Sequence, residues 1–226
     1  MARFLRNKPW LLSLLKPSPS SPPSRSFLSE PHLSTFDSNL LRILRSEIAC
    51  LADYRPPHPP VSSFKSFAVE DHPGEQWIRL RSKHGADDIK VDATMFDGAA
   101  PVPEAPLFKK VEAYEKGLRL HISLVVEVSR GEESDSVLEF ICSAWPDSLV
   151  VQKVFPLRRK GMAVTPYMGR DFRELEEGLR KSVQEYLEER GVDDELAEFL
   201  HEYMLNKDKA ELLRWLMIVE SYVQRG

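Results

Sequence analysis

The sequence predicts an α+β protein, with an antiparallel sheet of six or seven strands and amphipathic helices before and after it. From Ser63 to Phe155, apolar and polar residues alternate in short segments separated by turns, which is typical of antiparallel strands. The flanking segments repeat apolar residues at spacings of three and four, which is typical of helices with one apolar face. Because helix, strands and helices follow one another without internal repeats, we expect the helices to gather on one face of the sheet.

Length and composition are those of one sizeable soluble domain. The chain has 226 residues, of which 42% are hydrophobic and 29% charged. No apolar run approaches the roughly 18 residues that a membrane-spanning helix needs. The two cysteines, Cys50 and Cys142, form neither a disulfide framework nor a metal site, which favours a reducing compartment. Both lie in apolar stretches, so we expect them to be buried and unreactive.

Residues 1–27 have the composition of a targeting segment. They contain many serines, five basic residues and no acidic residue, which is typical of a mitochondrial transit peptide. Arg25, two residues before Phe27, suits a processing site; the alternative is a Pro/Ser-rich tail without a targeting role. Removing five positive charges would change the net charge from −4 to −9. Residues 28–226 would then be a clearly acidic domain.

The first elements follow the chain in order. Ser34 or Thr35 can cap a helix that runs to about Ala52, with an apolar stripe close to coiled-coil spacing. The prolines of residues 55–60 end this helix and form a stiff connector. Residues 97–106, rich in Gly, Ala and Pro, predict a loop, and residues 130–136 a polar turn. Strands are expected at residues 64–69, 77–83, 89–96, 107–114, 118–128, 137–145 and 149–155.

The last third of the chain predicts three helices in succession. Asp171 and Glu174 resemble a capping box for the first helix, and Gly191 suits its end. The Asp193-Asp194-Glu195 segment caps the second, and Asp208 with Glu211 opens the third. Helices with stripes this strong need a partner surface. The residues expected at an oligomer interface are Leu40, Leu44, Ile48, Leu179, Val183, Phe199, Leu212, Trp215, Leu216 and Val219.

Motifs of catalysis and cofactor binding are missing from the sequence. It contains no phosphate-binding glycine loop, no nucleophile elbow and no C-x-x-C. His201-Glu202 begins like a zinc-protease helix, but Leu205 occupies the position of the second histidine, so we expect His201 on a helix surface or interface. Glu132, Glu133 and Asp135 could meet a cation or a basic partner, although a solvated hairpin tip explains them as well. We therefore predict no catalytic, cofactor-binding or metal-binding residues.

Two basic clusters raise the alternative of RNA binding. One face of a predicted strand carries Arg79, Arg81 and Lys83 beside Trp77, the minimum for contact with a nucleic acid. Residues 158–160 form a second cluster. A net charge of −9 opposes a phosphate backbone at long range, so a solvated strand face is the favoured interpretation.

The C-terminal segments resemble the mitochondrial acidic matrix protein family, also called the mitochondrial glycoprotein family. The resemblance extends from about Thr35 to the C-terminus and is most specific in its last third. It is weaker at residues 167–172 and over the predicted hairpin of residues 118–145. The specific part is Tyr-Leu-Glu-Glu-Arg-Gly-Val-Asp-Asp-Glu-Leu-Ala-Glu-Phe-Leu-His from Tyr186 to His201, followed by Lys207-Asp208-Lys209 and Leu213-Arg214-Trp215-Leu216.

The resemblance implies a twisted sheet of seven antiparallel strands, flanked by one N-terminal and two or more C-terminal helices, in a ring-shaped homotrimer with an acidic, asymmetric surface. Family members are matrix proteins that act as adaptors or chaperone-like binders in oxidative phosphorylation and mitochondrial translation, and the best-known animal member binds a complement component. The family has no known catalytic residues to carry over. This chain is less acidic than the animal member, and its loop at residues 131–136 is short.

Three hypotheses follow for the function. The first is a non-enzymatic matrix homotrimer that binds basic proteins or mitochondrial ribonucleoprotein, without a membrane span, cofactor or small-molecule substrate. The second is an RNA-binding module that uses Trp77, Arg79, Arg81 and Lys83. The third is an enzyme with its site on the sheet, which the sequence disfavours because it shows no grouping of acid, base and nucleophile.

Overall fold

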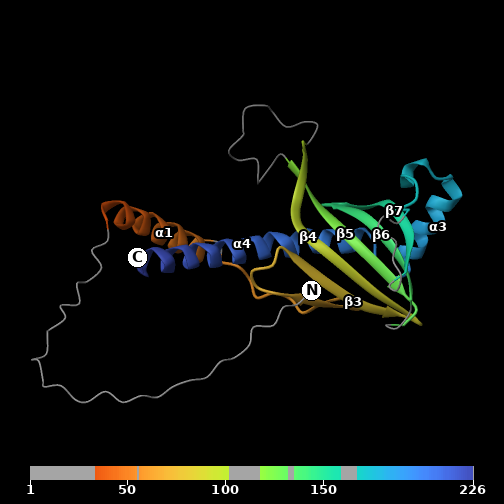
Figure 1. Cartoon of the computed structure of the whole chain (residues 1–226), viewed down its shortest axis with the longest axis horizontal. Helices are drawn as coiled ribbons and strands as arrows, with labels where there is room; N and C mark the ends of the chain where they lie inside the picture. Colours follow the sequence, from red (N-terminus) through yellow and green to blue (C-terminus); the bar gives the residue numbers. More distant parts are fainter. Residues whose placement is uncertain (1–33, 55, 102–117, 132–134, 159–166, 226) are drawn as a thin grey trace, which may run out of the picture.

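The computed structural model describes residues 34–54, 56–101, 118–131, 135–158 and 167–225. They form one sheet of seven antiparallel strands in the order β1-β2-β3-β4-β5-β6-β7, with helices before and after it (Figure 1). The α+β class and the sheet are as the sequence predicts. The strands are β1 (Ser63–Phe64), β2 (Phe67–Asp71), β3 (Trp77–His84), β4 (Asp87–Pro101), β5 (Leu118–Ser129), β6 (Ser136–Trp145) and β7 (Ser148–Arg158).

Two strands differ from the prediction. The first predicted strand is a hairpin of β1 and β2, because Lys65 adopts a left-handed φ of 48° between them. The strand predicted at residues 89–96 corresponds to β4, which does not end at Phe96 but continues through the predicted loop to Pro101. Pro101 pairs with Leu118. Two register shifts near Phe96 absorb the irregular composition while the pairing with β5 continues. The predicted strand at residues 107–114 lies outside the described residues.

One face of the sheet forms the core together with the N-terminal half of the last helix. Alternate residues of the central strands are fully buried, among them Leu80, Val91 and Leu124. They pack in one cluster with Leu196, Leu200 and Met204 of α4 (Asp194–Arg225). Helix α4 contacts β4, β6 and β7, so it lies across the sheet. The opposite face, called the outer face here, carries the polar residues of the same strands.

The helix ends follow local capping chemistry. Helix α1 (Thr35–Tyr54) is capped by Ser34, whose hydroxyl accepts a hydrogen bond from the Asp37 amide at 3.1 Å. Asp171 caps only the short helix η1 (Phe172–Glu174), where its carboxylate accepts from the Arg173 amide at 2.9 Å. Helix α3 (Glu177–Glu188) has its own cap in Glu176. The predicted first helix is therefore two elements, and they are followed by a turn in which Gly191 has the expected left-handed φ of 74°.

Helix α4 is continuous where the sequence predicts two helices. Its 32 residues contain neither glycine nor proline, so nothing in the backbone chemistry stops it. The polar residues around Asp208 interrupt the apolar stripe of the helix. Two of them, Asn206 and Lys207, do so because their side chains bond His58 and Asp71. None of the helices that the structure describes is long and apolar enough to cross a membrane.

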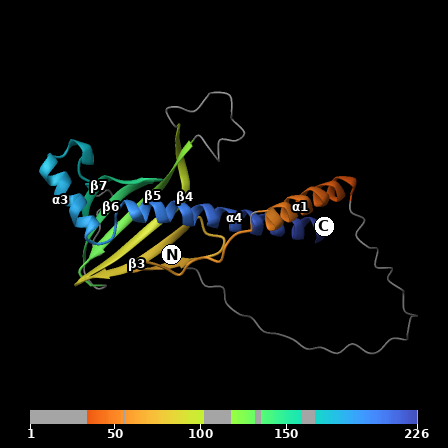
Figure 2. The same cartoon turned by 180° about the vertical axis from the view of Figure 1, so that it is seen from behind.

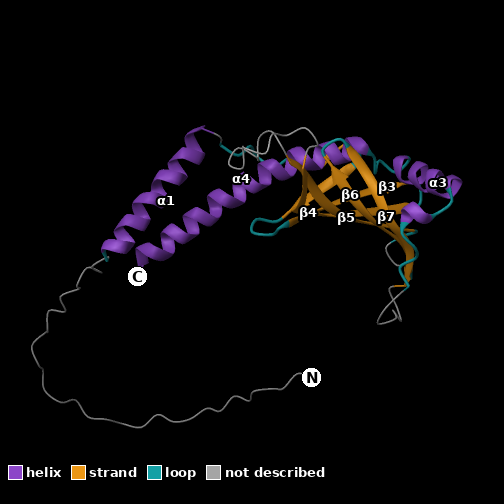
Figure 3. Ribbon diagram, turned by 90° about the horizontal axis from the view of Figure 1, so that it is seen from above, coloured by secondary structure: helices purple, strands orange, loops and turns teal. Residues whose placement is uncertain are grey.

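The C-terminal half of α4 leaves the sheet and pairs with α1. We call this pair, α1 with residues 208–225 of α4, the helical arm (Figure 3). Leu41, Leu44 and Leu216 are buried in it, and Arg45 bonds Glu220 at 2.8 Å. The arm lies at one end of the molecule and α3 at the other (Figure 1, Figure 2).

Candidate functional site

The helical arm exposes a large apolar surface. Trp215 is 58% exposed and Tyr222 80%, and Phe36, Ile43, Leu212, Met217 and Ile218 are exposed as well. A groove of about 660 Å³ runs along α4 there, lined by residues that include Leu213, Met217 and Ile218. Two helices that bury so few residues between them are marginal in water without a further layer. Contiguous apolar surface of this kind marks an interaction site.

The residues predicted at the oligomer interface lie in several separate regions of the structure. Leu212 and Trp215 lie exposed on the helical arm. Phe199 stacks on Phe64 with ring centroids 4.2 Å apart, so it packs within its own chain. Leu179 and Val183 belong to α3, at the end of the sheet away from the arm (Figure 1). The remaining five are buried or half-buried in the arm, namely Leu40, Leu44, Ile48, Leu216 and Val219.

A buried ion pair fixes α4 where it leaves the sheet. Lys207 is 2% exposed at its side chain, and its Nζ lies 2.5 Å from Asp71 Oδ1 and 3.3 Å from the His72 carbonyl oxygen. The Tyr203 hydroxyl donates to the other Asp71 oxygen at 2.8 Å. Burial raises the pKa of Tyr203, and its bond to the Asp71 carboxylate raises it further. Glu211 accepts from the Gly74 amide at 3.0 Å. We call Asp71, Tyr203, Lys207 and Glu211 the anchor cluster.

The sequence carried a signal for this cluster that the prediction did not use. Lys207 lies three residues after Met204 and therefore on the apolar stripe of the helix. A lysine in such a stripe is rarely buried unless it is paired. Asn206 adds a second connection, because its side chain bonds both the amide and the carbonyl of His58, at 2.7 and 2.9 Å.

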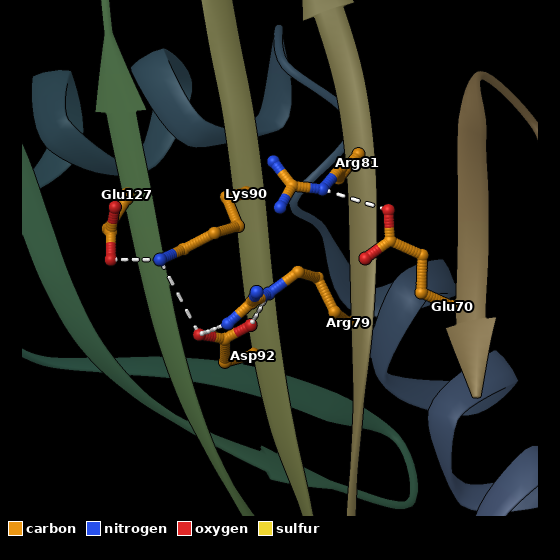
Figure 4. A network of polar contacts seen from close by, with 6 residues as sticks. All are labelled: Glu70, Arg79, Arg81, Lys90, Asp92 and Glu127. Atoms are coloured by element: carbon orange, nitrogen blue, oxygen red, sulfur yellow. Dashed lines mark hydrogen bonds and ion pairs between the residues drawn. The ribbon is translucent and has the colours of Figure 1, made fainter. Parts of the chain in front are cut away.

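The predicted basic patch is an ionic network on the outer face of the sheet (Figure 4). Arg79 bonds both oxygens of Asp92, at 2.6 and 2.9 Å, and this pairing raises the pKa of its guanidinium. Lys90 lies between Asp92 and Glu127, and Arg81 bonds Glu70 at 2.9 Å. We call these six residues the charged network.

Carboxylates oppose each cation of the patch. Outside the charged network, Lys83 pairs with Asp88 at 3.2 Å, and Trp77 lies against Arg79, with the guanidinium 4.9 Å from its ring. The four cations Arg79, Arg81, Lys83 and Lys90 line a hollow of about 670 Å³. Because Arg79, Arg81, Lys83 and Lys90 already have acidic partners, the hollow offers little excess positive charge to a phosphate backbone. Of the second cluster, residues 159 and 160 lie outside the described residues, as do Glu132 and Glu133.

Three smaller predictions have clear outcomes. His201 is not on a helix surface but buried, where its Nε2 lies 3.1 Å from the Ala144 carbonyl oxygen and burial lowers its pKa. Cys142 is buried, and burial raises its pKa to about 12. The prediction that Cys50 is buried is wrong: it is exposed, because α1 packs only against one side of α4. Among the residues described, no group of histidine, cysteine and carboxylate side chains is placed to hold a metal ion.

The acidic segment at the start of α4 does more than cap it. Asp193 accepts from the Leu196 amide at 2.9 Å, as the capping prediction requires. Asp194 accepts from the Leu149 amide at 2.8 Å, and Lys65 lies 2.6 Å from Glu195. These contacts hold the N-terminus of α4 against the two ends of the sheet meander.

Comparison with known sequences identifies relatives of the chain. The sequence model of the family described as Mitochondrial glycoprotein matches residues 47–223. The chain is 30% identical over 162 residues to an uncharacterized mitochondrial protein of Arabidopsis thaliana, covering 70% of this chain and 62% of that protein. It therefore spans less than two thirds of that relative. It is 24% identical over 193 residues to the mitochondrial acidic protein mam33 of Schizosaccharomyces pombe, covering 74% of this chain and 70% of the relative.

Solved structures share the fold. The crystal structure of the Trypanosoma brucei p22 protein matches with a TM-score of 0.66 at 23% identity. The match covers 84% of this chain and 100% of the other. A hypothetical protein from Leishmania major, described as a sequence homologue of human p32, matches with a TM-score of 0.61 at 18% identity. That match covers 83% of this chain and 99% of the other. At these identities the likeness establishes the fold and not the function.

Proposed function

Because the chain belongs to the mitochondrial glycoprotein family, we propose that it is an acidic homotrimer of the mitochondrial matrix whose role is binding and not catalysis. It acts as an adaptor or chaperone-like binder of basic proteins or ribonucleoprotein and supports oxidative phosphorylation or mitochondrial translation. Residues 1–27 serve as its transit peptide and are removed on import. The single observation that carries the assembly is the exposed apolar surface of the helical arm.

The arm suits assembly because a two-helix layer gains stability from a third helix packed on it. Its charge does not oppose this, since residues 35–54 and 208–225 together contain five basic and six acidic residues, a net of −1. Copies joined through their arms would form a ring that repeats the rest of the molecule around it. A repeated binding surface turns several weak contacts into a tight one.

The opposite end of the molecule suits a basic partner. Residues 172–202, called the acidic end here, contain eleven acidic and four basic residues, a net of −7. Many of these glutamates are exposed, including Glu185, Glu188 and Glu198. Such a field attracts cationic segments and accelerates their association at low ionic strength.

The first experiment is the solution mass of residues 28–226 by light scattering at low and high salt. A trimer at both salts supports assembly through the apolar arm, because apolar contacts are not weakened by screening. A monomer at both salts contradicts the ring and the avidity that depends on it.

The partner class is tested with a lysine-rich peptide and a single-stranded RNA of equal length. We expect peptide binding that weakens steeply with salt and is reduced when Glu185, Glu188 and Glu189 are changed together to glutamine. RNA binding that is lost on changing Arg79 and Arg81 would support the alternative RNA-binding function. The pairing of these arginines with Asp92 and Glu70 disfavours that outcome.

A further inference from the structure

Four polar side chains form a continuous chain of hydrogen bonds on the outer face, one from each of the strands β4, β5, β6 and β7. The Asp97 carboxylate lies 2.7 Å from Nδ1 of His121, and Nε2 of the same ring lies 2.7 Å from the Ser143 hydroxyl. The Gln152 side-chain amide donates to that hydroxyl at 2.5 Å. We call these four residues the polar chain. They are 24, 22 and 9 residues apart, so no local motif reveals them.

Three register shifts in the sheet bring these side chains together. The register shifts of β4 on either side of Phe96 place Asp97 beside His121 on the outer face. Gly98 allows the close approach, since a Cβ there would lie 3.3 Å from the Cβ of His121. A further shift, where β6 pairs with β7 next to Cys142, leaves Gln152 outside the regular pairing and within reach of Ser143. Bulges that redirect a side chain in this way are frequent beside active sites.

The hydrogen bonds define one arrangement of protons. A carboxylate only accepts, so in the neutral imidazole Nδ1 of His121 donates its N–H to Asp97, and Nε2 accepts from the Ser143 hydroxyl. Burial alone would raise the pKa of Asp97, but bonds from Ser123, His121 and Thr94 outweigh it and lower that pKa. Asp97 is therefore a carboxylate that orients the ring. This is the order of acid, base and hydroxyl found where a serine is activated as a nucleophile.

We propose that Ser143 is a base-activated nucleophile that accepts the acyl group of a small activated ester or thioester. Its oxygen bonds the acyl carbon while its proton passes to Nε2 of His121. The alcohol or thiol portion of the donor leaves with the electron pair of the broken bond, and Ser143 becomes an oxygen ester. This reactivity goes beyond the proposed binding function and uses neither the helical arm nor the acidic end.

The surroundings of Ser143 select for small donors. The residue is only 3% exposed, whereas Gln152, which bonds its hydroxyl, is exposed. Rotation of the exposed Gln152 side chain would remove its hydrogen bond and leave the Ser143 oxygen free to react. The rings of His121 and Trp145 meet edge to face with centroids 5.0 Å apart, which provides an apolar side against which an acyl group can lie.

The test treats the full chain with p-nitrophenyl acetate and locates acetyl groups by intact mass and peptide mapping. We expect one rapidly formed acetyl ester on Ser143, which the Ser143→Ala variant does not form. His121→Gln should slow its formation by about 100-fold, because general-base catalysis contributes at least that much. Asp97→Asn should slow it by at least about tenfold, because the ring is no longer held in the reactive tautomer.

The matched control is Ser82→Ala on β3, which removes a hydroxyl that bonds Ser66 at 2.9 Å and should leave the acetylation of Ser143 unchanged. Each variant is checked by circular dichroism and thermal unfolding. If His121→Gln does not fold, Asp97→Asn decides, since its side chain lies nearer the surface. The proposal is overturned if Ser143 stays unmodified while surface lysines become acetylated, or if the folded variants react at the rate of the unchanged protein.

Discussion

Replacing Lys207 with methionine tests whether the anchor cluster holds α4 to the sheet. Methionine keeps the unbranched stem but removes the ammonium group, so the Asp71 carboxylate loses its partner at 2.5 Å. Breaking a buried pair from one side costs about 3–5 kcal/mol of unfolding free energy. Asp71 is 17% exposed at its side chain and keeps the bond from Tyr203, so we expect about 3 kcal/mol, the lower part of that range.

The assay is urea unfolding followed by circular dichroism, at one fixed protomer concentration because association alters apparent stability. The matched control is Lys181→Met, which removes an exposed lysine whose Nζ lies 3.7 Å from Glu185. Exposed pairs within one helix contribute little, so this change should cost less than about 0.5 kcal/mol. Combining Lys207→Met with Asp71→Asn should cost less than the sum of the two single changes, because residues in direct contact are energetically coupled.

Two results would refute this reasoning. The first is a Lys207→Met variant that is no less stable than Lys181→Met. The second is a double variant whose cost equals the sum of the single variants, since additivity would mean that Lys207 and Asp71 are not coupled.

Three further predictions concern the arm and the buried titratable groups. Trp215→Asp, which places a charge on the exposed arm, should convert the proposed oligomer to monomer in light scattering while the thermal unfolding of the sheet stays cooperative; an unchanged mass would remove this surface from the proposed interface. Burial lowers the pKa of His201, so the unfolded state binds its proton first and stability is lost as pH falls below about 6.5, the ordinary histidine value. His201→Gln should reduce the loss of stability between pH 7.5 and 5.5 in urea unfolding, and an identical pH dependence would contradict this. Cys50 should react with a thiol reagent in the folded protein and Cys142 only in urea, because Cys142 is buried; equal rates without urea would show that the core is open.

The sequence predicted those features of the fold that depend on neighbouring residues. Alternation along the strands identified most of the meander, and capping chemistry placed the start of α1 at Ser34 or Thr35 and the turn at Gly191. The continuity of α4 was missed because Asn206 and Lys207 look like a polar interruption when their partners are unknown. Those partners, His58 and Asp71, lie 148 and 136 residues away.

The outer face was the least predictable part of the molecule. Sequence alternation identified Arg79 as a cation on one face of a strand, but its pairing with Asp92 depends on the register between β3 and β4. The polar chain depends even more on register, because it needs three register shifts, two in β4 and one between β6 and β7, that no local pattern encodes. Sites made of side chains from several strands are therefore visible only after the strands have been aligned.

The anchor cluster connects the two ends of the molecule that the proposed function separates. In that proposal, the apolar surface of the helical arm serves assembly, and the charge of the acidic end attracts a partner. A single helix, α4, runs through both, and its N-terminus is bonded to the sheet by Asp194 while its middle is bonded by Lys207. Because a continuous helix fixed at two points cannot turn independently of the sheet, copies joined through their arms would present their acidic ends in one defined orientation. Rigid spacing of this kind is what allows weak charge contacts to add up to avidity.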